Sequence, residues 1–141
     1  MIPDTVVAEL REGVHAHSHL TAVLEASWIE HCEVPVSAEF AMFAARLVGA
    51  NGRDIGETGV LAYAKTHGAT AVIDDGAARK AAQAYGVEHT GTLGLLCESI
   101  RTGLLTVALV SALADQLMEG EYRLPFGLGG FERWAKEQGL V

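Results

Sequence analysis

Cysteine, long apolar runs and basic residues are all scarce in this chain, and each shortage excludes a class of protein. The two cysteines, Cys32 and Cys97, stand far apart and show no paired spacing, which argues against a disulfide framework and against a zinc ribbon. No stretch reaches the roughly 18 consecutive apolar residues of a membrane helix, and the N-terminus lacks the basic and apolar regions of a secretory signal. We therefore expect a soluble cytoplasmic protein with no membrane association.

Basic residues are outnumbered by acidic ones, with 10 Lys and Arg against 18 Asp and Glu, which leaves a formal charge of −8. Nonspecific binding along nucleic acid depends on neutralising phosphates with basic side chains. A broad nucleic-acid interface is therefore not expected, and any contact with nucleic acid has to be local or bridged by a metal ion. The acidic excess also favours a partner that carries a basic segment.

The chain has 141 residues, half of them hydrophobic, which is enough to bury a core as one domain over residues 1–141. Stretches typical of helices alternate with short stretches typical of strands. "ATAVID" is the clearest buried strand, "GAARKAAQAYG" after it has a helical pattern, and "VEHTG" is a second short strand. A strand, a helix and a strand in this order predict a parallel pair with a right-handed crossover. The predicted fold class is α/β, as a three-layer α/β/α sandwich with a mostly parallel sheet.

Capping residues mark where the helices of the first half begin. Asp4 is expected to cap a helix that extends to Ala26, and Ser37 to cap a second, apolar helix. Asp54 and Glu57, three residues apart, predict a capping box at the start of a third helix, which ends at Gly68.

The chain after residue 91 predicts three closing helices, in "TLGLLCESIRTG", "LLTVALVSALADQLMEG" and "FERWAKEQG". Apolar residues in the middle one recur at helical spacing. Leu109 and Leu113, four residues apart, are expected to be buried against the sheet or against a second subunit.

Four acidic residues carry the predicted chemistry: Glu9 in the first helix, Glu57 in the first turn of its helix, and Asp74 and Asp75 at the end of the clearest strand. Side chains from strand ends and helix starts converge at one edge of a parallel sheet. A cluster of carboxylate oxygens suits Mg²⁺ or Mn²⁺, and such an ion stabilises charge on a phosphate and lowers the pKa of an attacking water. We therefore predict that these four residues hold a metal ion for phosphoryl hydrolysis.

Glu9, Glu57 and Asp75 each have a purely structural interpretation as well. Asp75 is a good N-cap for the helix that follows it. The role of Glu57 can be limited to completing the capping box, and Glu9 can be a solvated helix residue. Arg79 is a candidate clamp for substrate phosphate, but it also suits a surface salt bridge.

Three segments, "IPDTVVAEL", "RDIGETGVLAYAKTHGATAVIDDGAARKAAQAYGVEHTGTLGLL" and "GLLTVALVSALADQL", resemble the PIN-domain nucleases. They are most similar to the branch with a G-E helix start, an I-D-D-x-x-A-R strand end and a G-T-x-G-x-L motif. The resemblance implies a three-layer α/β sandwich and metal-dependent cleavage of RNA, and many bacterial members are toxins held by a cognate antitoxin. By position it assigns metal-binding roles to Glu9, Glu57 and Asp75, with Asp74 beside it, and Arg79 matches the arginine of the motif.

One part of the family pattern is not found. The family opens with a strand that ends in an aspartate, and this strand supplies the centre of the sheet and a metal ligand. Asp4 cannot replace that aspartate, because it matches the helix cap before Glu9. Either the start of the sequence is assigned too far downstream, or the protein is a shortened member with an incomplete site. The first explanation is favoured because backbone groups left unpaired by a lost strand cost about 1–3 kcal/mol each when buried. The predicted fold is therefore PIN-like and N-terminally shortened.

The predicted function is a Mg²⁺- or Mn²⁺-dependent endoribonuclease that hydrolyses RNA phosphodiester bonds, as the toxin of a toxin-antitoxin pair. Its catalytic residues are Glu9, Glu57 and Asp75, and its partners are RNA, an antitoxin protein and a second copy of the chain in a homodimer. One alternative is a non-catalytic PIN-like interaction protein that has lost a catalytic aspartate. A nucleotide-binding α/β domain is a further alternative, disfavoured because the sequence has no glycine-rich phosphate loop.

Overall fold

The computed structural model describes residues 1–48, 54–120 and 122–141. The contacts between residues divide the chain into two compact units, Met1–Thr90 and Gly91–Val141. Each unit has a hydrophobic core of its own. All strands of the described chain belong to the first unit, and the second unit is helical.

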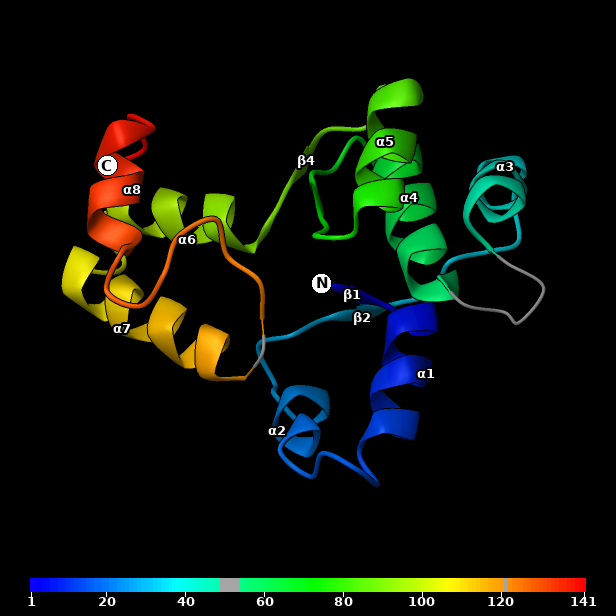
Figure 1. Ribbon diagram of the computed structural model, residues 1–141. Helices are drawn as coiled ribbons and strands as arrows, with labels where there is room; N and C mark the ends of the chain where they lie inside the picture. Colours follow the sequence, from blue (N-terminus) through cyan, green and yellow to red (C-terminus); the bar gives the residue numbers. More distant parts are fainter. Residues whose placement is uncertain (49–53, 121) are drawn as a thin grey trace. The chain divides into compact units, whose positions relative to one another are not determined.

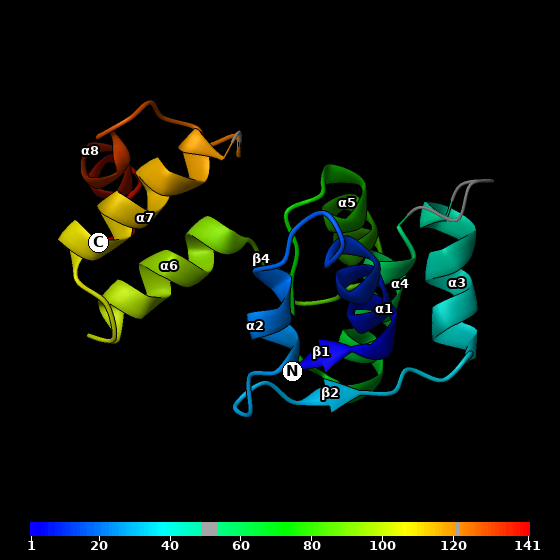
Figure 2. The same ribbon diagram turned by 90° about the horizontal axis from the view of Figure 1, so that it is seen from below.

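The short strands described in the first unit pair in parallel. β1 (Ile2–Pro3) pairs with β2 (His31–Cys32), and the two run side by side in Figures 1 and 2. β3 (Ala71–Val72) pairs with β4 (His89–Thr90). The predicted α/β class and the parallel pairing around a crossover helix are confirmed. Within the described chain the strands form two sheets of two strands each and not one continuous sheet, because no described strand lies between β1 and β3.

The helices described in the first unit are α1 (Asp4–Gly13), α2 (Leu20–Leu24), α3 (Ala38–Leu47), α4 (Ile55–His67) and α5 (Gly76–Ala84). The predicted cap of α3 is confirmed, since the Ser37 hydroxyl accepts a hydrogen bond of 3.2 Å from the Phe40 N–H. The predicted end of α4 is also confirmed. Gly68 follows it with φ 63°, in the left-handed region that favours glycine at a helix end.

The prediction of one helix from Asp4 to Ala26 is wrong, because α1 ends at Gly13 and α2 begins only at Leu20. Glycine is a poor helix former, and the stretch "HAHSH" that begins two residues after it contains a single apolar residue, Ala16, which is exposed.

The predicted capping box of α4 is also wrong. Asp54 lies in the left-handed region with φ 68°, and its side chain accepts no capping hydrogen bond. Its backbone carbonyl instead accepts hydrogen bonds from the hydroxyl of Thr58 at 2.9 Å and from the Thr58 N–H at 3.1 Å. The first turn of α4 therefore depends on other groups to satisfy its exposed N–H donors.

The core of the first unit combines a few large side chains with many alanines. Phe43 and Leu61 are fully buried, and Ile73 packs beside them from the end of β3. The buried alanines of α4, α5 and β3 let these elements approach closely: Ala62, Ala64, Ala71, Ala78, Ala81 and Ala82. Between α1 and α4 the approach is closer still, because a Cβ atom on Gly59 would overlap the Thr5 hydroxyl.

The second unit consists of α6 (Thr92–Arg101), α7 (Val107–Glu119) and α8 (Phe131–Glu137), which confirms the three predicted closing helices. Its core residues are Cys97, Val110, Ala114, Phe131 and Ala135.

Within the helical unit, the buried face of α7 is displaced by one residue from the predicted pair, and burial of that pair against a second subunit stays a prediction. Val110 and Ala114 are fully buried, whereas Leu109 is 47% exposed and Leu113 is half-buried. Both pairs have the spacing of one helical turn, so the periodicity alone does not distinguish them. Packing within the helical unit decides which pair is covered.

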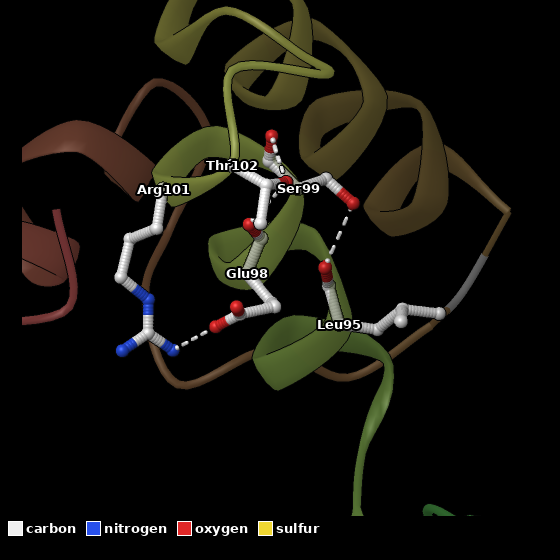
Figure 3. A network of polar contacts seen from close by, with 5 residues as sticks. All are labelled: Leu95, Glu98, Ser99, Arg101 and Thr102. Atoms are coloured by element: carbon white, nitrogen blue, oxygen red, sulfur yellow. Dashed lines mark hydrogen bonds and ion pairs between the residues drawn. The ribbon is translucent and has the colours of Figure 1, made fainter.

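Polar side chains close the last turn of α6, as Figure 3 shows. The Ser99 hydroxyl donates to the Leu95 carbonyl, and the Thr102 hydroxyl donates to the Glu98 carbonyl, each at 2.9 Å. Arg101 pairs with Glu98 at 2.7 Å. A basic side chain at a helix C-terminus also interacts favourably with the helix dipole. None of the described helices is long and apolar enough to cross a membrane.

Candidate active site

Three of the four predicted acidic residues line one small cavity of the first unit. This cavity of about 230 Å³ is bordered by Glu9 from α1, Glu57 from the first turn of α4, and Asp74 from the segment after β3. Valine and isoleucine side chains form the rest of its wall with Gly56. The fold thus brings together Glu9 and Asp74, which are 65 positions apart in the sequence.

Glu9 is held by the start of α4. Its Oε1 atom accepts a hydrogen bond of 2.9 Å from the backbone N–H of Gly56. A Cβ atom on Gly56 would overlap the Glu9 carboxylate, so only glycine leaves room for this contact. The interaction satisfies one of the N–H donors that the absent capping box leaves in the first turn of α4. The glycine before Glu57 is the sequence signal from which this contact could have been suspected.

Glu57 is half-buried, and its pKa is raised above the ordinary carboxyl value of 4.5. Burial is the largest cause, because it disfavours the charged carboxylate. The negative charges of Glu9, Asp54 and Asp75 raise the pKa further, although a hydrogen bond from the backbone of Glu57 itself opposes the shift. A cation in the cavity would relieve this repulsion.

Asp74 and Arg79 form an ion pair at the edge of the cavity. The Nη2 atom of Arg79 lies 2.8 Å from Oδ1 of Asp74, and its Nε–H donates to the Ile73 carbonyl at 3.0 Å. Arg79 thus interacts with both the side chain and the backbone at the end of β3. This is the salt bridge that the sequence left open as the alternative to a phosphate clamp.

Asp75 has a different position from its neighbour. Its Oδ1 atom accepts hydrogen bonds from the N–H groups of Ala77 at 2.7 Å and Ala78 at 2.8 Å, so it caps α5. The side chain does not line the acidic cavity, although its charge contributes to the raised pKa of Glu57. The structural interpretation of Asp75, as the N-cap of the helix that follows it, is therefore confirmed.

The chemistry of these donors fits a hard divalent cation, because every charged side chain that lines the cavity is a carboxylate. Their geometry is less complete. Among residues 1–48, 54–120 and 122–141, no group of three or more His, Cys, Asp or Glu side chains is placed to hold a metal ion. The predicted set of Glu9, Glu57, Asp74 and Asp75 thus has the ligand type that a divalent cation prefers. Its members do not, however, converge on one metal position as a complete site.

Parallel strands, an interposed helix and carboxylates around one cavity define an α/β domain with an acidic site. The family model DUF3368, described as a PIN domain, matches residues 1–128. The chain therefore belongs to the PIN-domain family and has a PIN-like α/β fold. This membership indicates a nuclease-type function, and PIN domains in general depend on divalent metal ions. No curated protein and no solved structure matches the chain.

Proposed function

We propose that this protein is a Mg²⁺- or Mn²⁺-dependent endoribonuclease with its active site at the cavity of Glu9, Glu57 and Asp74. The observation that carries the proposal is that the side chains of Glu9, Glu57 and Asp74 line one small cavity, where burial and neighbouring negative charge raise the pKa of Glu57. Perturbed pKa values of this kind concentrate at functional sites. The family membership supports the same chemistry.

Glu9, Glu57 and Asp74 would hold the cation with their carboxylate oxygens. The divalent ion, when bound, would lower the pKa of an attacking water and stabilise negative charge on the phosphate. The contact with Gly56 fixes the orientation of Glu9, and Arg79 does the same for Asp74. Arg79 also supplies positive charge beside the cavity, where it can bind a substrate phosphate. Asp75 contributes its charge from the start of α5.

The test is cleavage of a fluorescent single-stranded RNA by the 141-residue protein in Mn²⁺, in Mg²⁺ and in EDTA. Cleavage should require the metal, and Glu57→Gln or Asp74→Asn should abolish it. Glu12→Gln is the matched control, because Glu12 is exposed on α1 and does not line the cavity. Cleavage that persists in EDTA, or that survives Glu57→Gln, would contradict the proposal.

We also propose that the nuclease acts as a toxin with a protein antitoxin. The formal charge of −8 and the acidic cavity favour a basic segment on that partner. Induced expression in a bacterial host should arrest growth, and the Glu57→Gln variant, produced at the same level, should not. Equal growth arrest by both proteins would show that the toxicity does not depend on the proposed active site.

One observation favours a second function, that of a non-catalytic interaction protein. The described carboxylates do not form a group of three placed around one metal position. A protein that cleaves no RNA in any divalent ion, while Mn²⁺ leaves its melting temperature unchanged, would support this alternative.

A further inference from the structure

The connection between α1 and α2 contains three of the six histidines of the chain: His15, His17 and His19. Figure 1 shows this connection as the loop between the two blue helices. All three side chains are exposed. Imidazole nitrogen is a good ligand for Zn²⁺ and other transition-metal ions, so the arrangement of the three rings decides whether the loop can bind one.

Backbone hydrogen bonds fix the path of this loop. The carbonyl of Gly13 accepts a hydrogen bond of 2.9 Å from the N–H of His17. The carbonyls of His17 and His19 accept in turn from the N–H groups of Leu20 at 3.0 Å and Ala22 at 3.1 Å. The two ends of the loop lie close together, because a Cβ atom on Gly13 would be 2.9 Å from Cδ1 of Leu20. The loop therefore holds the backbone of His17 and His19 in place.

The rings of His17 and His19 lie next to each other. Their centroids are 5.8 Å apart, and their planes are tilted by 57°. The lone pair of an imidazole nitrogen lies in the plane of its ring, so a bound metal ion lies in that plane as well. Two tilted planes intersect, which allows a single ion to lie in both. The tilt of this pair is therefore compatible with a shared ion, whereas parallel stacking would not be.

The distance between the two rings also suits a shared ion. Zinc–nitrogen bonds in proteins are about 2.0–2.1 Å long, which places the centroids of two imidazoles about 5 Å apart around a tetrahedral ion. The centroids of His17 and His19 are 5.8 Å apart, slightly farther than this. Rotation about the side-chain bonds of two exposed residues can close the difference without moving the backbone.

The surroundings of the pair leave it open to a cation. Neither imidazole forms a hydrogen bond or an ion pair with another described residue. The sequence between Arg11 and Arg46 contains five glutamates and no lysine or arginine. A divalent cation at His17 and His19 would therefore meet no fixed positive charge from this stretch of the chain.

We propose that His17 and His19 form a second metal site, in which their two imidazoles chelate one Zn²⁺ ion and water completes the coordination. This site differs in ligand type from the acidic cavity, because imidazole suits Zn²⁺ whereas carboxylate suits Mg²⁺ and Mn²⁺. In the described part of the chain, no third His, Cys, Asp or Glu is placed to complete a group of three around an ion. The site is therefore an open one, and its ion would link the α1–α2 loop to the start of α2.

The experiment titrates Zn²⁺ into the full chain and follows the imidazole resonances of all six histidines by NMR. Excess Mg²⁺ is present to compete for the carboxylates, and no RNA is present, so the result is independent of cleavage. The resonances of His17 and His19 should shift together, with the same dissociation constant, before those of the other histidines. Zn²⁺ should also raise the melting temperature, because it binds the folded loop.

Substitution of each histidine by alanine tests which rings bind the ion. His17→Ala and His19→Ala should each weaken Zn²⁺ binding by about tenfold or more, since loss of a ligand costs at least as much as loss of an outer-shell partner. The double variant should bind hardly more weakly than either single variant, because two ligands of one ion are coupled. His31→Ala is the matched control, since it removes an exposed imidazole from β2. All of these side chains are exposed, so the melting temperature in EDTA should not change.

Joint shifts of His17 and His19 that are lost in both single variants and kept in His31→Ala would establish the site. Shifts spread evenly over the six histidines, or additive losses in the double variant, would show independent surface binding and overturn it. An equal loss in His15→Ala would replace the proposed pair with a three-histidine site. Absence of any shift at the Zn²⁺ concentrations that the protein tolerates in solution would also overturn the proposal.

Discussion

Glu9 accepts a hydrogen bond of 2.9 Å at Oε1 from the backbone N–H of Gly56, which joins α1 to the first turn of α4. This contact positions a site carboxylate with a main-chain group, so its geometry depends on how closely the two helices approach. It also satisfies an N–H donor at a helix start that has no side-chain cap. The first prediction follows from this dependence.

Gly56→Ala should displace the Glu9 carboxylate, because the new Cβ would overlap it. The Gly56 N–H would lose its charged acceptor, a loss of about 1.5–3 kcal/mol that is partly offset by the better helix propensity of alanine. RNA cleavage and the Mn²⁺-induced rise in melting temperature should both fall. Gly76→Ala is the control, because a Cβ there meets no atom within 4 Å. Unchanged activity in Gly56→Ala would show that the contact with Glu9 is not needed.

The raised pKa of Glu57 predicts a pH dependence of stability with a definite sign. In the folded protein the carboxyl holds its proton above the ordinary value of 4.5, so the folded state binds the proton more tightly than the unfolded state does. This contribution to the unfolding free energy is fully present below about pH 4.5 and is lost as the pH rises through the raised pKa. Glu57→Gln cannot titrate, and its stability should fall less across this interval.

Urea unfolding in EDTA at a series of pH values measures this difference, with Glu12→Gln as the control that should follow the parent protein. Metal-dependent cleavage should rise over the same interval, because the cation binds the charged carboxylate. Parallel stability curves for Glu57→Gln and the parent would contradict the assigned shift.

Asp75 caps α5 and is also proposed to contribute negative charge to the metal site. Two substitutions distinguish these two roles. Asp75→Asn keeps an oxygen that can accept from Ala77 and Ala78, so its stability should change little. Asp75→Ala removes the cap and should cost about 0.5–2 kcal/mol. If the charge also serves the cation, Asp75→Asn should reduce the Mn²⁺-induced rise in melting temperature. An identical rise in the parent and in Asp75→Asn, measured by calorimetry, would leave Asp75 as a cap only.

Arg79 is predicted to act on substrate phosphate as well as on Asp74. Arg79→Gln should raise KM for RNA by about tenfold or more, the effect of losing a charged hydrogen bond, and Arg79→Lys should have an intermediate effect because it lacks the planar fork. Stability should change by less than about 1 kcal/mol, since the ion pair is partly exposed. A fall in kcat at constant KM would instead show that Arg79 only positions Asp74.

The hydroxyl of Thr5 is buried in the α1–α4 contact and has no hydrogen-bond partner among the described residues. Thr5→Val keeps the shape of the side chain and removes the unsatisfied group. The unfolding free energy should therefore rise, by up to about 1–3 kcal/mol. Denaturant unfolding measures the change, and Thr70→Val, at an exposed position, is the control. A loss of stability in Thr5→Val would indicate that the hydroxyl has a partner in solution.

Features that depend on a few neighbouring residues could be predicted from the sequence. Ser37 caps α3 because its hydroxyl oxygen accepts a hydrogen bond from the N–H of Phe40, three residues further along the chain. Gly68 ends α4 because its conformation excludes most other residues. The parallel pairing of β3 and β4 follows from the short helix between them. The carboxylates Glu57 and Asp74 were candidates because they stand at a helix start and at a strand end.

Contacts between distant segments were decided only by the tertiary structure. Glu9 and Gly56 are 47 positions apart, and nothing local indicates that they touch. The neighbours Asp74 and Asp75 are equivalent in the sequence, but packing turns one toward the cavity, while the other caps α5. On α7, Leu109 and Val110 fit the same periodicity, and only the second is buried. Local patterns fix which backbone conformation a segment prefers, whereas the direction of each side chain depends on which surfaces the packed elements cover.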